Sequence, residues 1–175
     1  SIADVSLLSG LLVDKFLYHL PLYRQHQRIQ QAGIQLSRTT LTNLVKRSID
    51  LLKPIVVAQL KHVLQSKVLA VDETPIKAGR AGKGKMKTGW FWPVYGEADE
   101  VVFTFSNSRA RQHLDDTLKP HFSGTLISDG YAAHARYAEQ TEGVTHAQCW
   151  THTRRQYIEA EADEPVSVAW ALEMI

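Results

Sequence analysis

Cysteine and long hydrophobic runs are what this sequence has least of. Cys149 is its only cysteine, which excludes an intramolecular disulfide and suits a reducing cytoplasm. No apolar run approaches the roughly 20 residues that a membrane-spanning helix needs, so we expect no membrane partner. The N-terminal stretch contains no basic flank leading into an apolar core, and so no secretion signal. These absences favour a soluble cytoplasmic protein.

The net charge of the chain is also small. Lysine and arginine number 20 against 18 aspartates and glutamates, an excess too small to indicate a nucleic-acid partner by itself. The distribution is uneven, because residues 77–87 carry five basic side chains and no acid, while residues 159–164 carry four acids. Taken alone, each cluster is explained by a solvated loop or helix face. A hydrophobic content of 44% is typical of an ordinary globular chain.

Both ends of the chain lack the usual boundary signals. The sequence does not begin with methionine, and its last residues stop inside an apolar-periodic stretch without a helix stop signal. We expect both ends to be cut from a longer protein.

The first part of the chain, residues 1–66, predicts helices because its apolar residues recur at helical spacing. Pro21 suits the first turn of a second helix, and Gly33 suits the left-handed stop at the end of that helix. Ser37 is the predicted N-cap of a third helix. Pro54 should kink or restart that third helix.

The second and third predicted helices, joined by the short turn AGIQLS, resemble a helix-turn-helix. The third helix would present side chains that can contact phosphates and base edges, namely Arg38, Thr42, Asn43, Lys46 and Arg47. The alternative is a plain helical hairpin that packs against the next domain. We therefore expect a helix-turn-helix-like DNA-binding segment over residues 1–66, with that alternative left open.

The hydrophobic period changes at Lys67. Residues 68–76 are rich in β-branched side chains and predict a strand, and two further strands follow a glycine- and lysine-rich stretch. The pattern then predicts a helix, a short buried strand, a helix, a strand and a last helix. This is the order expected of an RNase H-like α/β fold, a mixed sheet flanked by helices. We assign that core to residues 67–175.

Two carboxylates are predicted to lie on central strands. Asp72 is inside an apolar strand, where aspartate is disfavoured, and Asp129 ends another short apolar strand. A divalent cation would compensate for both charges, and Mg²⁺ prefers such hard oxygen ligands. The alternatives without a metal are a helix cap or surface carboxylate at Asp72 and an Asp-Gly turn at Asp129. Glu73 leaves the first ligand open, because neighbouring strand residues point to opposite faces.

Three potential zinc ligands, His146, Cys149 and His152, follow at three-residue intervals. A zinc site needs a fourth ligand, and no residue in the sequence marks one. The three side chains also cannot all point one way if residues 146–150 form a strand. We therefore favour a buried cysteine beside a helix start over a zinc site.

The sequence contains five stretches that carry a family resemblance: HLPLYRQHQRIQQAGIQLSRTTLTNLV, VDETPIK, GWFWPVYG, SDGYAAHARY and HAQCWTHTRRQYIEA. Together they cover most of residues 18–160 and resemble the insertion sequence 66 family of bacterial transposases, within the DDE superfamily. The resemblance implies an enzyme that cuts DNA and joins strands through an RNase H-like core. It also implies insertion-sequence ends and target DNA as partners, self-association in the full-length protein, accessory proteins of the same element, and a place near the bacterial nucleoid.

The resemblance assigns roles to individual residues. Asp72 matches the family's first catalytic aspartate and Asp129 its second, which selects Asp72 over Glu73 by analogy alone. Both would hold Mg²⁺, with Mn²⁺ as a substitute. His152 ends a C-x-x-H signature that follows the second aspartate, and it is expected near the scissile phosphate or beside a carboxylate. Lysines in the predicted hairpin loop would neutralise DNA phosphates, namely Lys83, Lys85 and Lys87.

One departure from the family's pattern concerns the third acid. The superfamily requires a glutamate on a later helix, and the expected L-Y-x-x-E motif does not occur before residue 175. The candidates by residue type alone are Glu159, Glu161, Glu164 and Glu173. We expect the true glutamate to lie beyond this chain and the family's zinc-binding N-terminal region to be missing. This fragment should therefore be inactive or severely weakened.

Three alternative interpretations share parts of this pattern. An RNase H-like nuclease or Holliday-junction resolvase would keep the fold but would not join strands. A decayed or domesticated transposase would bind DNA through residues 21–50 without catalysis. In the third alternative, the helical segment simply buttresses the core.

Overall fold

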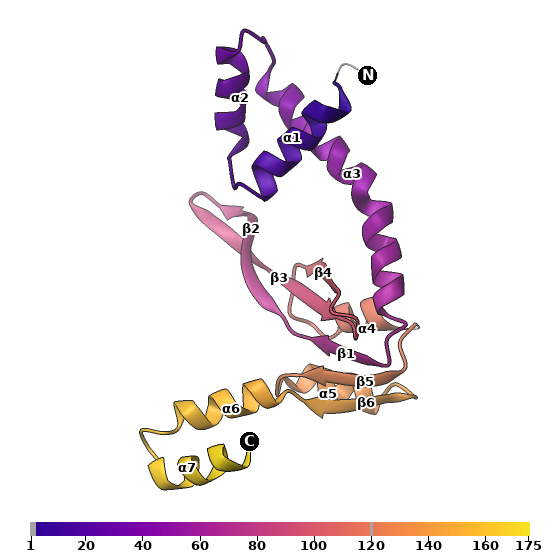
Figure 1. Cartoon of the computed structure of the whole chain (residues 1–175), viewed down its shortest axis with the longest axis vertical. Coiled ribbons are helices and arrows are strands. Elements are labelled where there is room, and N and C mark those ends of the chain that lie inside the picture. The colour runs from indigo at the N-terminus through magenta and orange to yellow at the C-terminus, as the bar shows by residue number, and fades with distance from the viewer. Residues whose placement is uncertain (1–2, 120) are drawn as a thin grey trace. The chain divides into compact units, whose positions relative to one another are not determined.

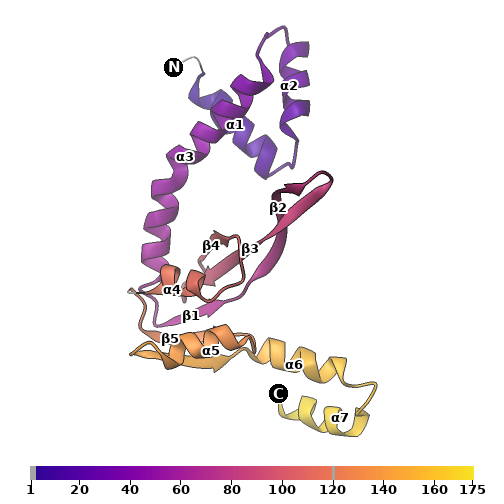
Figure 2. The same ribbon diagram turned by 180° about the vertical axis from the view of Figure 1, so that it is seen from behind.

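A computed structural model describes residues 3–119 and 121–175, apart from the side chain of residue 80. The chain divides into two compact units, an N-terminal unit of residues 1–57 and a C-terminal unit of residues 58–175. The N-terminal unit is helical, whereas the C-terminal unit contains the β-sheet (Figures 1 and 2). Within the described residues, no helix combines the length and the apolar character needed to cross a bilayer.

Three helices make up the N-terminal unit: α1 (Val5–Phe16), α2 (Leu22–Gln31) and the first part of α3 (Arg38–Val63). Helical periodicity places their apolar residues on facing sides, so that they bury a small cluster built on Leu11, Leu41 and Val45. This cluster gives the unit a hydrophobic core of its own.

The ends of α2 and α3 follow the signals in the sequence. Gly33 adopts φ +84°, and the backbone N–H groups of Gly33 and Ile34 donate back into the last turn of α2. This pair of bonds is a Schellman motif, which favours glycine because of the positive φ. The Ser37 hydroxyl accepts a hydrogen bond from the Thr40 backbone N–H at 3.0 Å and so caps α3.

The course of α3 corrects the expectation that the helix could restart at Pro54. The helix runs from Arg38 to Val63 without restarting at Pro54. Proline lacks the N–H that would reach back to the carbonyl group of residue 50, a loss that usually kinks or breaks a helix. Residues 51–57 are all solvent-exposed, so water can hydrate the carbonyl group that is left free.

Six strands form one mixed sheet in the C-terminal unit. They are β1 (Val68–Val71), β2 (Thr74–Gly82), β3 (Lys85–Tyr95), β4 (Val101–Ser106), β5 (Gly124–Ser128) and β6 (Val144–Gln148). The registers place β1 and β2 one after the other along one edge of β3, antiparallel to it, and β4 along its other edge. On the far side of β1, β5 and then β6 continue the sheet as parallel strands. The strand predicted over residues 68–76 is thus interrupted at residues 72–73.

The β2–β3 hairpin corrects a second expectation. The glycine- and lysine-rich stretch forms extended, paired strands, and only Lys83 and Gly84 form the turn between them. Gly79, at φ +71°, lies where the β2–β3 register shifts between Lys77 and residue 80. This shift is a β-bulge, which often contains a glycine with a positive φ. Of the three lysines expected in a loop, Lys85 and Lys87 therefore lie on β3.

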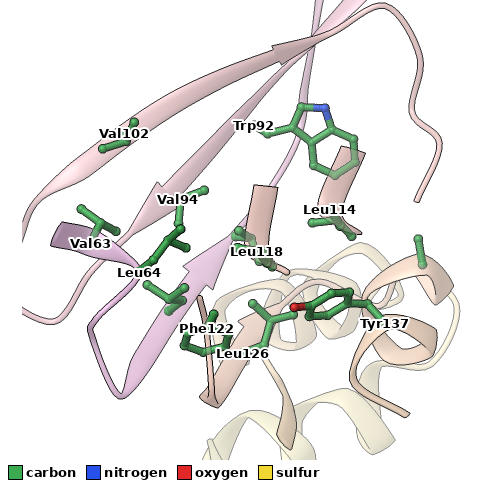
Figure 3. Close-up of a cluster of buried hydrophobic side chains, with 13 residues drawn as sticks. Val63, Leu64, Trp92, Val94, Val102, Leu114, Leu118, Phe122, Leu126 and Tyr137 are labelled. Atoms are coloured by element: carbon green, nitrogen blue, oxygen red, sulfur yellow. The ribbon is translucent and has the colours of Figure 1, made fainter. Parts of the chain in front are cut away.

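Helices α4 (Gln112–Leu118) and α5 (Ala132–Glu139) follow β4 and β5, while α6 (Trp150–Glu159) and α7 (Pro165–Met174) follow β6. The core forms between one face of the sheet and α4 and α5 (Figure 3). Alternate strand residues face this core, because the side chains of a strand alternate between its two faces. Its members with at most 1% exposure are Val63, Leu69, Trp92, Val94, Leu118, Leu126 and Tyr137.

The start of β5 requires glycine. The Thr125 backbone N–H donates to the Lys67 carbonyl oxygen at 2.8 Å, which opens the β1–β5 ladder. A Cβ atom at Gly124 would lie 2.2 Å from that same oxygen.

We expect Gly124→Ala to lower the free energy of unfolding by about 1–3 kcal/mol, measured by urea titration, because a backbone atom cannot move aside as a side chain can. Gly82→Ala is the control, since a Cβ there meets no atom within 4 Å. Equal effects of the two substitutions would contradict this account.

Candidate metal centre

The carboxyl ends of β1 and β5 meet at one edge of the sheet. The two strands pair in parallel with Leu69 opposite Leu126 and Ala70 opposite Ile127. Asp72 follows the last residue of β1, and Asp129 follows the last residue of β5. Because the strands run in the same direction and in this register, positions 72 and 129 occupy corresponding places beyond the two strand ends.

Asp72 and Glu73 diverge into different surroundings. The Asp72 side chain is 43% exposed, whereas the Glu73 side chain is 1% exposed. This follows from strand alternation, since Leu69 and Val71 face the core and Glu73 continues their series. The Asp72 carboxylate also accepts a hydrogen bond from the Glu73 backbone N–H at 2.8 Å.

On the exposed side, Asp72 faces the first turn of α6. The Asp72 Oδ2 atom lies 3.9 Å from Nε2 of His152. Both residues line a small pocket together with Ser128 and Cys149. Burial alone would raise the pKa of the Cys149 thiol, but hydrogen bonds from His152 and Thr151 outweigh that effect and lower this pKa.

On the buried side, Glu73 pairs with Arg109. The Arg109 Nε donates to Glu73 Oε1 at 2.6 Å, and the Arg109 guanidinium lies 4.0 Å from the centre of the Tyr131 ring and 5.2 Å from that of Trp90. Burial raises the pKa of Glu73, and the Arg109 guanidinium only partly opposes this rise. The nearby Asp129 and Asp72 charges also contribute to the raised pKa of Glu73.

His134, in the first turn of α5, lies between two of these carboxylates. Its Nε2 is 3.5 Å from Glu73 Oε2, and its Nδ1 is 3.3 Å from Asp129 Oδ1. The Tyr131 backbone N–H also donates to Asp129 Oδ1, at 3.0 Å. Burial lowers the pKa of His134, and the neighbouring Asp129 charge opposes this shift.

Glu73, Asp129 and His134 are the residues most able to hold a cation in the described parts of the chain. Each offers one ligand atom, and these atoms lie within 4.8 Å of one another. Neither Glu73 Oε2 nor either ring nitrogen of His134 has a hydrogen-bond partner among the described residues. Carboxylate oxygens suit Mg²⁺ and Mn²⁺, so the donor set fits a divalent cation at this edge.

The sequence pattern did not reveal the buried half of this cluster. Glu73 was one of two open choices, and strand alternation placed it opposite Asp72 without saying which of the two faces the core. His134 and Arg109 carried no signal, because a histidine on a short helix and an arginine in a loop are common without any special role. Only the folded chain brings these two residues to Glu73.

The other candidate residues lie apart from this cluster. His146 exchanges a hydrogen bond with the Ser128 hydroxyl at 2.9 Å, whereas His152 faces Asp72, so these two histidines do not converge on one ion with Cys149. The glutamates proposed by type alone are solvent-exposed, namely Glu159, Glu161, Glu164 and Glu173. The side chains predicted to contact DNA are exposed as well, namely Arg38, Thr42, Asn43, Lys46, Arg47, Lys83, Lys85 and Lys87.

These features define an α/β protein with acidic side chains gathered beyond the ends of two neighbouring parallel strands. Over residues 1–175 the sequence matches the family described as Transposase IS66 family. The chain belongs to that family.

Three proteins of Sinorhizobium fredii are similar to the chain, and all three are described as uncharacterized. One of them, y4jD, is 31% identical over 170 residues, which is 90% of this chain and 33% of y4jD. Another, y4hP, is 31% identical over 88% of the chain and 29% of its own length, and y4qI is 28% identical over 86% of the chain and 30% of its own length. The chain thus spans about a third of the length of the curated relatives that it matches.

The buried Glu73 carboxylate makes the role of Arg109 testable. We expect Arg109→Ala to lower the free energy of unfolding by about 1–2 kcal/mol at pH 8, since it leaves a buried charge unpaired. The expected loss is smaller than for a fully buried ion pair, because Arg109 is partly exposed to solvent. Glu73→Gln in the same background should restore most of this loss. Urea titrations of the two single variants and the double variant measure the coupling.

The same variant should show a defined pH dependence. Without Arg109, the folded-state pKa of Glu73 rises further above its unfolded value of about 4.3, so the protonated form is favoured in the folded chain. The part of the Arg109→Ala penalty that comes from the unpaired carboxylate is therefore absent below that value and grows as pH rises through the folded-state pKa of Glu73, whereas the loss of the Tyr131 and Trp90 contacts is the same at every pH. Arg155→Ala, which removes an exposed arginine, is the control and should show no such growth. A penalty for Arg109→Ala that does not change between pH 4 and pH 8 would contradict the ion-pair account.

Proposed function

We propose that this chain is part of a DNA transposase that cleaves phosphodiester bonds at insertion-sequence ends and transfers the freed strand to target DNA. The observation that carries the proposal is the in-register parallel pairing of β1 and β5, which brings Asp72 and Asp129 to one edge of the sheet. Family membership supports a transposase-related function.

We further propose that the C-terminal unit is an RNase H-like catalytic core. Three strands in antiparallel succession, β1, β3 and β4, are followed by a helix and then by two strands parallel to β1. The spatial order β4-β3-β1-β5-β6 supports this assignment because it puts the two aspartates on adjacent central strands. Helix α5, between β5 and β6, provides the crossover connection that parallel pairing requires.

In this proposal Asp72 and Asp129 hold Mg²⁺, for which Mn²⁺ can substitute. When bound, the divalent ions would activate the attacking oxygen and stabilise the leaving oxygen of a phosphodiester. The chain's own contribution is to fix the two carboxylates: His152 lies beside Asp72, and the Tyr131 backbone N–H and His134 hold Asp129. A DDE site also needs a third acid, and we do not assign that role to the exposed glutamates of α6, α7 and the segment between them. The proposed activity is therefore that of the complete gene product.

We also propose that α2 and α3 act as a helix-turn-helix-like DNA-binding segment. The predicted contact residues on α3 are solvent-exposed, while Leu41 and Val45 on the same helix are buried, so the helix has a polar face free for DNA. The lysines of the β2–β3 hairpin would add phosphate contacts. Self-association, accessory proteins of the same element and a location near the bacterial nucleoid belong to this proposal as well.

The catalytic assignment is tested by removing each aspartate from the complete gene product. We expect Asp72→Ala and Asp129→Ala each to reduce Mg²⁺-dependent cleavage at least a hundredfold, on DNA taken from both sides of the reading frame. DNA affinity should change by less than about threefold, because phosphate contacts come mainly from lysine and arginine. Asp163→Ala, in an exposed turn, is the matched control.

Unimpaired cleavage by Asp72→Ala would contradict the catalytic role of Asp72. The reaction products test the alternative within the same experiment. Joined strands indicate transposition, and cleavage without joining indicates an RNase H-like nuclease or resolvase.

The DNA-binding assignment is tested on α3. We expect Lys46→Ala to weaken DNA binding on all sequences alike and to reduce the slope of log affinity against log salt by about 1, as the loss of one phosphate contact does. Lys53→Ala, farther along the same exposed helix, is the control and should leave both quantities unchanged. Identical behaviour of the two variants would favour a plain helical hairpin, and fluorescence anisotropy over a salt series makes the measurement.

A further inference from the structure

The imidazole of His134 has a carboxylate at each end. Its Nδ1 lies 3.3 Å from Asp129 Oδ1 and its Nε2 lies 3.5 Å from Glu73 Oε2, while its side chain is 0% exposed. Neither ring nitrogen of His134, nor Glu73 Oε2, has a hydrogen-bond partner among the described residues, so the facing carboxylates at 3.3 and 3.5 Å are near contacts and not formed hydrogen bonds. Because an unpaired buried polar atom is costly, the three side chains have only one another to satisfy them.

Packing fixes the direction in which the ring points. The His134 ring meets the Tyr131 ring edge to face at 5.6 Å and the Trp92 ring at 6.2 Å between centroids. Arg109 holds the other oxygen of Glu73 through a 2.6 Å hydrogen bond from its Nε. Arg109, Glu73, His134 and Asp129 therefore form a continuous line of polar contacts that ends at the strand edge.

The Asp129 end of this line has a consequence for metal binding. Its Oδ1 already accepts the Tyr131 backbone N–H and faces His134 Nδ1, so Oδ2 is the oxygen left for a cation. We propose that His134 is a positioning residue: its Nδ1–H group orients the Asp129 carboxylate, and Glu73 with Arg109 holds the ring from the other side. This inference rests on the proposed role of Asp129 as a metal ligand.

Two observations favour positioning over direct ligation by His134. Each ring nitrogen faces a carboxylate, so binding a cation through either nitrogen would withdraw the ring from one of them. The Glu73 end already carries the Arg109 guanidinium, which disfavours a second cation there. Hydrogen bonds from outer side chains commonly orient metal-binding carboxylates, and their loss weakens metal binding by about 10–100-fold.

The two ring nitrogens can be tested separately. The amide nitrogen of asparagine takes the place of Nδ1, and that of glutamine takes the place of Nε2. Mn²⁺ affinity is measured on the chain by the loss of the free Mn²⁺ electron paramagnetic resonance signal. We expect His134→Gln to weaken Mn²⁺ binding about tenfold or more, whereas His134→Asn stays within about threefold of the original. His134→Phe keeps an aromatic ring without either nitrogen and should behave as His134→Gln does.

The same series separates the alternatives. Equal Mn²⁺ affinities for the Asn and Gln variants would overturn the inference, because a purely structural role would not distinguish the two nitrogens. Better binding by His134→Gln would overturn it in favour of contact through Nε2. Thermal unfolding without metal is recorded for each variant, so that a loss of fold is recognised as such.

A second measurement needs neither a variant nor a metal. Long-range nitrogen–proton NMR spectra of the original chain show which ring nitrogen of His134 carries a proton. A proton on Nδ1 supports the inference, and a proton on Nε2 alone overturns it. If Asp129→Ala leaves Mn²⁺ binding unchanged, the proposed metal site fails, while the NMR result still decides the arrangement of His134.

Discussion

The register of the parallel pair formed by β1 and β5 is the constraint on which the rest of the site depends. Side chains of a strand alternate between its faces, so a slip of one residue would exchange the positions of Asp72 and Glu73. The exposed carboxylate would then point into the core and the buried one toward solvent. The hydrogen bond from Thr125 to the Lys67 carbonyl group, close against Gly124, fixes the register at the opposite end of the pair.

A buried line of charged and polar groups supports the Asp129 carboxylate at an energetic cost. The contacts from Arg109 to His134 place a carboxylate and an imidazole where apolar side chains would pack without a desolvation cost. Such networks are stabilising only when every member is satisfied, and they then fix one arrangement of their side chains. Local structure that departs from the best packing is typical of functional sites, and here the line of polar contacts ends at Asp129, the proposed metal ligand.

Most of the secondary structure could be predicted, because it depends on local chemistry. Gly33 and Ser37 mark helix ends through backbone geometry and capping, and both act as predicted. The uninterrupted helix through Pro54 and the extended β2–β3 hairpin depend on solvent exposure and strand pairing, which composition does not encode. The surroundings of Asp72 and Asp129 were only partly predictable. The strand end at Asp129 could be located from the apolar pattern, whereas Asp72 was expected inside a strand and instead follows the end of β1. The contact between Asp129 and His134 needs the turn that precedes α5.

The same turn contains an Asp-Gly pair, a sequence that is prone to isomerisation of the aspartate. Asp129 precedes Gly130, and because glycine has no side chain, none hinders the backbone nitrogen next to the Asp129 carboxyl carbon. In Asp-Gly pairs of this kind the backbone nitrogen attacks the carboxyl carbon with loss of water, and the resulting succinimide takes up water again and reopens mostly as isoaspartate, with an extra methylene in the main chain. At position 129 that change would carry the carboxyl group away from β5. The hydrogen bond from the Tyr131 backbone N–H restrains the Asp129 carboxylate, and this restraint would oppose the ring closure.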